Sequence, residues 1–460
     1  MIWKVKKRHK PSNQGWRVKI DCQQRAENCS HGAKKPANDP MPRLPGGPCH
    51  HRFRRHNGPL RALKTLISRI FVQSMPFQCP TWPPDWPSIE LAIQEAIRTG
   101  QWGQYHSPLI KSLQKRLAEY LKSGPIRLCC SGTAALELAL RCCRIRETDE
   151  VILAAYDFPG NFRTVELLGA KPVLVDATSN FIAGRHAISP TPDAEQVAAA
   201  ASPSVRAVIA SHLHGSQADM HALRQICDEH GWFLIEDACQ AIGGQIDGEP
   251  IGSFGHLATL SFGGSKLISA GSGGAIIAND QRLAARLGGL LDRPGDTFPI
   301  GPLQCAAIQP QLQRLDELNR VRNLTAEFLR KNVFQELADW EVLTTSANSR
   351  PQTPDDPSTS TRSTIAAHYK FGWLTPSNET RQHVIEHGRA MGLPLGEGFR
   401  SMSSASAKRC RKIGSMPHAE TLGERLVVMD HRALLTPPEH HDELRDSMHE
   451  LYRYVNAIGG

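Results

Sequence analysis

Long hydrophobic runs are absent from this sequence of 460 residues. A helix that spans a membrane needs about 18 or more consecutive, mostly apolar residues, and no stretch approaches that length. No pattern typical of a secretory signal peptide opens the sequence either. We therefore expect no membrane-spanning segment and no membrane partner, and we predict a cytoplasmic protein.

The cysteines lack the spacing of a disulfide framework. Nine of the twelve lie beyond residue 75 in apolar stretches, and they include the adjacent pairs Cys129/Cys130 and Cys142/Cys143. Such positions are typical of reduced, mostly buried thiols in a cytosolic protein. The other three cysteines and the histidines near them match no zinc-ligand spacing, so we predict no metal site.

Two glycine motifs that mark nucleotide-binding proteins are missing as well. No G-x-G-x-x-G opens a helix after the first predicted strand, and no lysine follows the glycines of "SGTAALELAL" as it does in a Walker loop. These absences argue against a nucleotide-dependent oxidoreductase and against a P-loop NTPase. No internal repeat is visible.

Acidic residues are scarce only at the start of the chain. Residues 1–74 hold 17 Lys+Arg against 3 Asp+Glu, whereas the rest holds 37 against 42. This basic head is rich in Pro, Gly and Asn and lacks apolar periodicity, which is typical of an unfolded segment. A basic tail can bind nucleic acid. We favour the alternative that translation begins at Met75 and that the upstream stretch is a start-site artefact, so we expect no nucleic-acid partner.

Helical and strand patterns alternate from residue 88 onward. "SIELAIQEAIRTG" and "SPLIKSLQKRLAEYLKSG" repeat apolar residues at intervals of three and four and end at glycine, which predicts two amphipathic helices with glycine C-caps. Short apolar runs such as "EVILAA", "KPVLVDA" and "WFLIEDA" then alternate with further helical patterns. Strands separated by helices predict an α/β protein with a mostly parallel central sheet that is buried on both faces.

The length of the chain predicts more than one packed unit. We expect a large domain over residues 75–335 and a smaller C-terminal α+β domain over residues 336–460, joined by a long helical pattern. The segment near 344–363 is polar and rich in proline, and we expect a mobile loop there.

A turn at the end of the first predicted strand has the features of a phosphate site. The strand passes through Ser131-Gly132-Thr133 into a helix. This arrangement offers free backbone N–H groups, a hydroxyl and the positive end of a helix dipole, which together bind phosphate. The same residues also form ordinary helix caps, so this turn alone does not identify a ligand.

An acidic pair ends another predicted strand. In "WFLIEDACQAIGG" the apolar run stops at Glu236 and Asp237, and Gln240 follows. The carboxyl ends of buried parallel strands are where α/β sheets bind ligands. An acid at this point can bind a metal, a ribose or a protonated ring nitrogen, or it can cap a helix.

One lysine lies between two glycine-rich turns. Lys266 follows the apolar run "LATLSF" and precedes "GAIIA", so its local context predicts an interior position. Burial favours the neutral amine, which is the better nucleophile toward a carbonyl. Flanking glycines allow the backbone to approach a bulky group. A surface lysine in a hairpin turn is the alternative.

Taken together, the phosphate turn, the acid and the lysine follow one another within one predicted sheet. Pyridoxal 5′-phosphate requires these three groups: an anchor for its phosphate, a carboxylate for its ring nitrogen and an amine for its aldehyde. The combination therefore predicts a pyridoxal-phosphate enzyme.

The chain resembles the DegT/StrS family of sugar aminotransferases from about residue 87 to 335 and less clearly to its end. This family has the fold-type-I architecture of pyridoxal-phosphate enzymes. The matching stretches, in chain order, are "GQWGQYHSP", "SGTAALELAL", "VILAAYDFPGNFRTVELLGAKPVLVDA", "HLHGSQADM", "IEDACQAIGG", "SFGGSK" with "GSGGA", and "AAIQPQLQRLDELNRVR".

The resemblance implies a role for each candidate residue. Lys266 would bond to the cofactor aldehyde, and Asp237 would pair with the ring nitrogen. His214 lies in a loop that the family places near the cofactor, and a structural role for it is equally open. The remaining implied contacts are Gly132, Thr133 and Ser261 at the phosphate, Phe158 stacked on the ring and Gln240 at its phenolic oxygen.

The implied reaction moves an amino group from glutamate or glutamine to a keto sugar, usually nucleotide-linked, or to a keto cyclitol, in a homodimer. Retention of Lys266 favours transamination, since the family's dehydratases carry histidine there. A pyridoxal-phosphate-dependent sugar dehydratase and a non-catalytic, cofactor-binding regulatory protein are the alternatives.

Two departures from the family pattern stand out. Ser272 replaces the glutamate of a Gly-Glu-Gly-Gly stretch. In addition, "FPIGPLQCAAI" replaces an Asn-x-Arg-Met stretch, whose asparagine reaches the cofactor phosphate of a neighbouring subunit.

Overall fold

The computed structural model describes residues 76–182, 185–291, 298–337, 339–345 and 364–459. The predictions for the basic head and for most of the polar loop near 344–363 therefore lie outside the described residues. Within these ranges, the structure contains no helix with the length and apolar character needed to cross a membrane.

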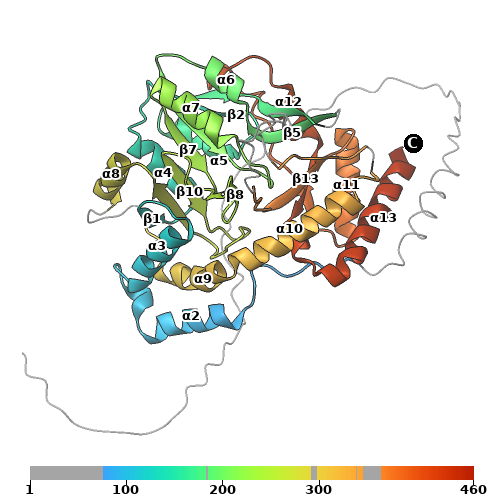
Figure 1. The fold of residues 1–460 in the computed structure, drawn as a ribbon, viewed down its shortest axis with the longest axis horizontal. Coiled ribbons are helices and arrows are strands. Elements are labelled where there is room, and N and C mark those ends of the chain that lie inside the picture. Colours follow the sequence, from blue (N-terminus) through green and yellow to red (C-terminus); the bar gives the residue numbers. More distant parts are fainter. Residues whose placement is uncertain (1–75, 183–184, 292–297, 338, 346–363, 460) are drawn as a thin grey trace, which may run out of the picture. The chain divides into compact units, whose positions relative to one another are not determined.

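Eight strands form the central sheet (Figure 1). In sheet order they are β1 (Ile126–Cys129), β11 (Gly274–Ala278), β10 (Leu257–Ser261), β7 (Phe233–Asp237), β6 (Val205–Ser211), β2 (Glu150–Ala154), β3 (Lys171–Val175) and β15 (Arg411–Lys412). Neighbouring strands from β10 to β15 run parallel, and β11 runs antiparallel to both of its neighbours. The prediction of an α/β protein with a mostly parallel sheet is confirmed.

Apolar side chains fill both faces of this sheet. Every residue of β11 is buried, and so is the run Leu234–Asp237 of β7. Burying one such aliphatic side chain contributes about 1.5–3 kcal/mol, so strands that bury both faces are strongly held in register. The sheet is consequently a rigid base for whatever side chains follow its strand ends.

Helices cover the sheet and its edges. Among the described residues up to 313 these are α2 (Pro87–Arg98), α3 (Pro108–Tyr120), α4 (Gly132–Cys142), α5 (Pro159–Leu167), α6 (Ala194–Ala199), α7 (Met220–His230), α8 (Gln281–Leu291) and α9 (Pro302–Gln313), with a short 3₁₀ turn, η1 (Gln101–Gly103). The two predicted N-terminal helices correspond to α2 and α3. Gly100 follows α2 with a left-handed φ of 72°, as predicted. After α3 the left-handed residue is Lys122, because the chain leaves the helix two residues before the glycine.

A second, smaller sheet of four antiparallel strands lies in the C-terminal part. Its order is β12 (Glu341–Val342), β13 (Lys370–Leu374), β16 (Leu426–Asp430) and β14 (Leu395–Glu397). Its helices are α10 (Leu315–Asn332), α11 (Asn378–Ala390), α12 (Pro417–Arg425) and α13 (His441–Gly459), with 3₁₀ turns η2 (Ala433–Leu435) and η3 (Pro438–His440). Figure 1 shows α10 running from the region of the large sheet to the small one, as the predicted linking helix does.

Part of the C-terminal chain returns to the large sheet. Strand β15 pairs with β3, and the Arg411 guanidinium lies 2.8 Å from a carboxylate oxygen of Glu150 in β2. The chain from Gln73 onward forms one compact unit. The boundary between residues 335 and 336 remains a prediction. Two hairpins, β4 (Ala177–Ile182) with β5 (Arg185–Pro192) and β8 (Gln245–Ile246) with β9 (Glu249–Pro250), complete the fold.

Candidate active site

Polar side chains gather where four parallel strands of the large sheet end. β7 ends at Asp237, β6 ends at Ser211, β10 ends at Ser261, and Asp157 follows β2 closely. Because the carboxyl ends of parallel strands meet at the same edge, these residues share one side of the sheet. This edge is where the sequence predicts a ligand.

Asp237 is buried and held by three donors. The Asn161 Nδ2 group donates to Asp237 Oδ2 over 2.9 Å, while the backbone N–H of Cys239 and the Thr259 hydroxyl donate to Oδ1 over 3.1 and 3.3 Å. Only 6% of the Asp237 side chain is exposed. Its carboxylate is therefore fixed in direction before any ligand arrives.

The predicted phosphate turn lies beside the end of β10. Ser131 Oγ accepts the N–H of Ala134 over 3.0 Å and so begins α4, as predicted. A Cβ on Gly132 would lie 2.8 Å from the Ser261 Cβ and 2.9 Å from the Cys239 sulfur, so this position admits only glycine. The first N–H groups of a helix have no intrahelical partner. The start of α4 at Gly132 therefore packs closely beside Ser261, and its free N–H groups and the exposed Thr133 are donors suited to an anion.

Lys266 lies in the glycine turn after β10. Its backbone N–H donates to Gly263 O over 2.9 Å, and its Nζ lies 4.4 Å from the centroid of the Tyr369 ring. The Tyr369 hydroxyl is hydrogen-bonded to Ser265 Oγ at 2.8 Å. The prediction that Lys266 lies in the interior is only partly right. Lys266 is half-buried, and its neighbours Gly264 and Ser265 in the glycine turn are exposed. The aromatic face of Tyr369 lies against the amine.

Two further side chains hold the backbone of this turn. The Trp82 indole N–H donates to Lys266 O over 3.0 Å, and His431 Nε2 lies 3.1 Å from Ser265 O. Burial lowers the pKa of His431 to about 3, and the nearby Arg322 guanidinium acts in the same direction. Its ring is therefore neutral at physiological pH and donates through Nε2 while Nδ1 accepts from Arg322.

Phe158, Gln240 and His214 lie around the same edge. Phe158 is 41% exposed and packs against Phe399 with ring centroids 5.7 Å apart. Gln240 Oε1 accepts the backbone N–H of His214 over 3.2 Å. His214 Nε2 is hydrogen-bonded to the Tyr156 hydroxyl at 3.0 Å, and burial lowers the pKa of His214 to about 3. Phe158 is thus available to a ligand, whereas Gln240 and His214 brace each other.

Cys239 shows that the predicted groups share one site. Its backbone N–H binds Asp237, and its sulfur lies against the space beside Gly132. Burial raises the pKa of the Cys239 thiol well above its usual range, the charge of Asp237 raises it further, and the charge of Lys266 lowers it. Asp237, Lys266 and Gly132 therefore all lie near Cys239, and the charges of Asp237 and Lys266 both act on its thiol.

The two departures from the family pattern also lie near this edge. Ser272 is exposed in the turn before β11, between Gly271 and Gly273, which have left-handed φ values of 75° and 134°. The segment that replaces Asn-x-Arg-Met begins beside the phosphate turn, where Phe298 O accepts the N–H of Cys130 over 3.0 Å.

Several residues of the site were not predicted from the sequence. Asp157 follows one predicted strand, and Asp237 ends another. The rule that ligands bind at the carboxyl ends of buried parallel strands could therefore have singled out Asp157 as well as Asp237. The contacts of the other residues join distant parts of the chain and carry no local signal. These residues are Asn161, Ser211, Thr259, Tyr369, Trp82 and His431.

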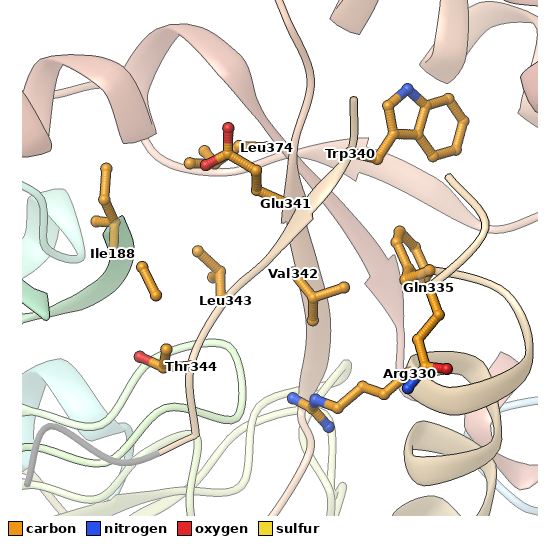
Figure 2. Close-up of a pocket in the computed structure, with 11 residues that line it drawn as sticks. Ile188, Arg330, Gln335, Trp340, Glu341, Val342, Leu343, Thr344 and Leu374 are labelled. Atoms are coloured by element: carbon orange, nitrogen blue, oxygen red, sulfur yellow. The ribbon is translucent and has the colours of Figure 1, made fainter. Parts of the chain in front are cut away.

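A separate cavity of about 270 Å³ lies between β5 and the small sheet. Figure 2 shows Ile188, Arg330, Thr344 and Leu374 around it. None of the predicted site residues lines this cavity. Within the described residues no group of three or more His, Cys, Asp or Glu side chains could hold a metal ion.

The side chains at the sheet edge fit pyridoxal 5′-phosphate by the chemistry of their donors. The free N–H groups at the start of α4 suit a phosphate, the oriented carboxylate of Asp237 suits a protonated ring nitrogen, and the amine of Lys266 suits an aldehyde.

Comparison with known proteins gives a consistent picture. The model of the DegT/DnrJ/EryC1/StrS aminotransferase family matches residues 87–447. L-glutamine:2-deoxy-scyllo-inosose aminotransferase from Streptoalloteichus tenebrarius is 28% identical over 398 residues, which cover 77% of this chain and 90% of the relative. UDP-N-acetyl-3-dehydro-alpha-D-glucosamine 3-aminotransferase from Acidithiobacillus ferrooxidans is 41% identical over 163 residues, covering 35% of this chain and 42% of the relative.

A solved structure has the same fold. The GDP-4-keto-6-deoxy-D-mannose-3-dehydratase of E. coli, with bound hydrated PLP, superposes with a TM-score of 0.66 at 18% identity. The match covers 82% of this chain and 100% of the dehydratase. At that identity the likeness shows a shared fold.

Proposed function

Because the chain belongs to the DegT/DnrJ/EryC1/StrS aminotransferase family, we propose that its amino acceptor is a nucleotide-linked keto sugar or a keto cyclitol. The proposed donor is glutamine or glutamate, and the proposed cofactor is pyridoxal 5′-phosphate. The observation that carries this proposal is the convergence of Lys266, Asp237 and the helix start at Gly132 on one sheet edge.

Some residues of the site would hold the cofactor, and others would control the transfer of protons. Gly132, Thr133 and Ser261 would bind the phosphate through backbone N–H groups and hydroxyls. Asp237 would keep a proton on the ring nitrogen, since its carboxylate is already oriented by three donors. When bound, the cofactor supplies an electron-withdrawing ring that stabilises the charge left by removal of a proton from the substrate carbon.

Lys266 is the proposed acid and base. Its Nζ would take the proton from the substrate carbon and return it to a neighbouring carbon, which requires an amine that can move within a confined space. The face of Tyr369 offers the charged amine a resting position 4.4 Å away. Phe158 would lie against the ring and exclude water from one side, and Gln240 would approach its phenolic oxygen.

The printed names of the relatives support the substrate classes. One relative takes its amino group from L-glutamine and acts on an inosose, which is a keto cyclitol. Another acts on a UDP-linked dehydro-glucosamine, which is a nucleotide-linked keto sugar. We further propose a cytoplasmic homodimer, which rests on the family resemblance.

A spectroscopic and product assay tests the proposal. Purified protein saturated with pyridoxal 5′-phosphate should absorb visible light, and glutamine or glutamate should bleach this band as the amino group moves to the cofactor. Addition of nucleotide-linked keto sugars or keto cyclitols should restore the band and give an aminated product by mass spectrometry. Lys266→Ala should lack both the band and the product.

Borohydride trapping and peptide mapping provide the control. The label should lie on Lys266 and not on Lys370, whose Nζ lies near the same tyrosine ring at 4.7 Å. A band that survives Lys266→Ala, a label on Lys370, or a dehydrated product without nitrogen would each contradict the proposal.

A further inference from the structure

A second buried carboxyl group lies beside Asp237. Asp157 follows β2, two strands from β7, and only 1% of it is exposed. Two buried carboxyl groups in one network are costly when both are charged, because each disfavours the ionised form of the other. The pair must therefore be stabilised by hydrogen-bond donors or by a bound proton.

Asn161 connects the two carboxyl groups, and Ser211 supports Asn161 and Asp157. The Asn161 Nδ2 group lies 2.9 Å from Asp237 Oδ2 and 3.2 and 3.3 Å from the two oxygens of Asp157. The Ser211 hydroxyl donates to Asp157 Oδ2 over 2.9 Å, and the backbone N–H of Phe158 donates to Oδ1 over 2.6 Å. One amide group therefore donates to both acids, and both bridging residues are buried.

The charge of Asp237 has a measurable consequence for its neighbour. Burial raises the pKa of Asp157 to about 7, and the charge of Asp237 acts in the same direction. The three hydrogen-bond donors oppose this shift. Other titratable groups on the packed elements face elsewhere: His212 Nε2 lies 3.2 Å from Glu236, and the Tyr156 hydroxyl is directed to His214.

Resting on the proposed function, we propose that Asp157 is a positioning residue for Asp237 and that it releases a proton to solvent when the protonated ring nitrogen of the cofactor comes to lie against Asp237. Asn161, which donates to both carboxyl groups, carries the coupling, and Ser211 donates to Asp157. No bond other than the O–H bond of Asp157 breaks, and the proton passes to water.

The sign of the effect follows from electrostatics. In the cofactor-free protein, Asp157 binds a proton as the pH falls through about 7. A positive charge beside Asp237 offsets its negative charge, so the ionised form of Asp157 becomes less costly and its pKa falls. At a pH between the two pKa values of Asp157, its carboxyl group is protonated in the cofactor-free protein and ionised in the cofactor-bound protein. Cofactor affinity through this group therefore falls as the pH drops below about 7.

Titration calorimetry tests this coupling. Pyridoxal 5′-phosphate is added to cofactor-free protein at about pH 6.5 in two buffers of different ionisation enthalpy, which gives the number of protons released. A group with a pKa of about 7 is mostly protonated there. Asp157→Asn should release fewer protons than the unchanged protein, by at most about 0.7. The titrations of the cofactor itself and of Lys266 are common to both proteins and cancel in the difference.

Asp176→Asn is the matched control. Asp176 is another buried carboxyl at the end of the next strand, β3, and it accepts backbone N–H groups of Ala177 and Ala419. The same replacement there should leave the proton count unchanged. Equal counts for Asp157→Asn and the unchanged protein, or an equal loss in Asp176→Asn, would overturn the proposal.

A measurement on the cofactor-free protein separates this inference from the proposed function. A carboxyl whose pKa is raised on folding stabilises the protein below its unfolded value and loses that contribution as the pH rises through its folded value. The melting temperature of the unchanged protein should therefore fall relative to that of Asp157→Asn between about pH 4 and 7. Ser211→Ala removes a donor to the ionised form, so it should move the midpoint of this fall to higher pH.

The outcomes are distinguishable. A pH-dependent melting difference without any visible absorbance would contradict the cofactor but leave Asp157 as a titrating group. Absorbance with no melting difference, or a midpoint that Ser211→Ala moves to lower pH, would refute the role of Asp157.

Discussion

The two reactive groups of the site are held in opposite ways. The partners of Asp237 come from the large sheet and the helix beside it: Asn161 lies in α5, Thr259 in β10, and Cys239 just after β7. The turn that carries Lys266 is held by side chains from elsewhere in the chain. Its contacts with Tyr369, His431 and Trp82 span 104, 166 and 184 residues.

This difference separates a rigid side from an assembled side. A buried parallel sheet fixes its strand ends by backbone pairing, so the carboxylate side is complete once the sheet has formed. The lysine side is complete only when β13, the segment after β16 and the segment before α2 have packed around the turn. Damage to the first should affect chemistry alone, whereas damage to the second should affect stability and cofactor affinity together.

The largest effect is expected on the carboxylate side. Asp237→Asn keeps the shape and loses the charge that would hold a proton on the ring nitrogen. The rate of amino transfer should fall about 100- to 1000-fold or more, as when an electrostatic partner of a reacting group is lost. The melting temperature of the cofactor-free protein should not fall, because one buried negative charge is removed. Single-turnover absorbance measures the rate, and an unchanged rate would exclude Asp237 from the reaction.

A smaller effect on rate, but a larger one on stability, is expected on the lysine side. His431→Leu leaves Ser265 O without its donor and deprives the buried Arg322 guanidinium of an acceptor at 3.3 Å. Arg322 keeps Asn319 Oδ1 as a partner at 2.9 Å, and a buried polar group that loses its hydrogen-bond partner costs about 1–3 kcal/mol. The cofactor-free protein should therefore melt at a lower temperature, and cofactor affinity should fall with it.

His441→Leu is the control for this change. His441 is also buried, and its Nε2 lies 3.0 Å from the Thr325 hydroxyl. Thr325 lies on α10, the helix that carries Arg322, but His441 does not contact the lysine turn. The His441→Leu variant should melt at a lower temperature than the unchanged protein but bind the cofactor with unchanged affinity. If both variants lost affinity equally, the lysine side would depend on general packing and not on the hydrogen bond to Ser265.

The same division explains how far the sequence could predict the site. Asp237 and Gly132 follow apolar strands, and Lys266 follows another between glycines, so periodicity and turn residues were enough to find them. The central sheet was predictable for the same reason. Strand β15 was not, since two residues, Arg411 and Lys412, carry no apolar run.

The residues around the lysine turn could not be predicted at all. Tyr369, His431 and Trp82 lie in segments whose local patterns indicate only strands and loops. Their role arises from the way the small sheet and the N-terminal segment pack on the turn, and a single sequence contains no local signal for contacts of that range.

The smallest effect should come from a single hydrogen bond on the lysine side. Trp82→Phe removes the indole N–H that donates to Lys266 O but keeps an aromatic ring near His431, whose ring centroid lies 4.7 Å away. One such bond contributes about 1 kcal/mol, so cofactor affinity should fall about fivefold. Trp86→Phe is the matched control, because Trp86 lies in the same segment but stacks on Arg314. Equilibrium titration of the visible band measures both. An equal loss in the two variants would mean that the segment acts by packing, and the assembled side would then depend on shape more than on directed bonds.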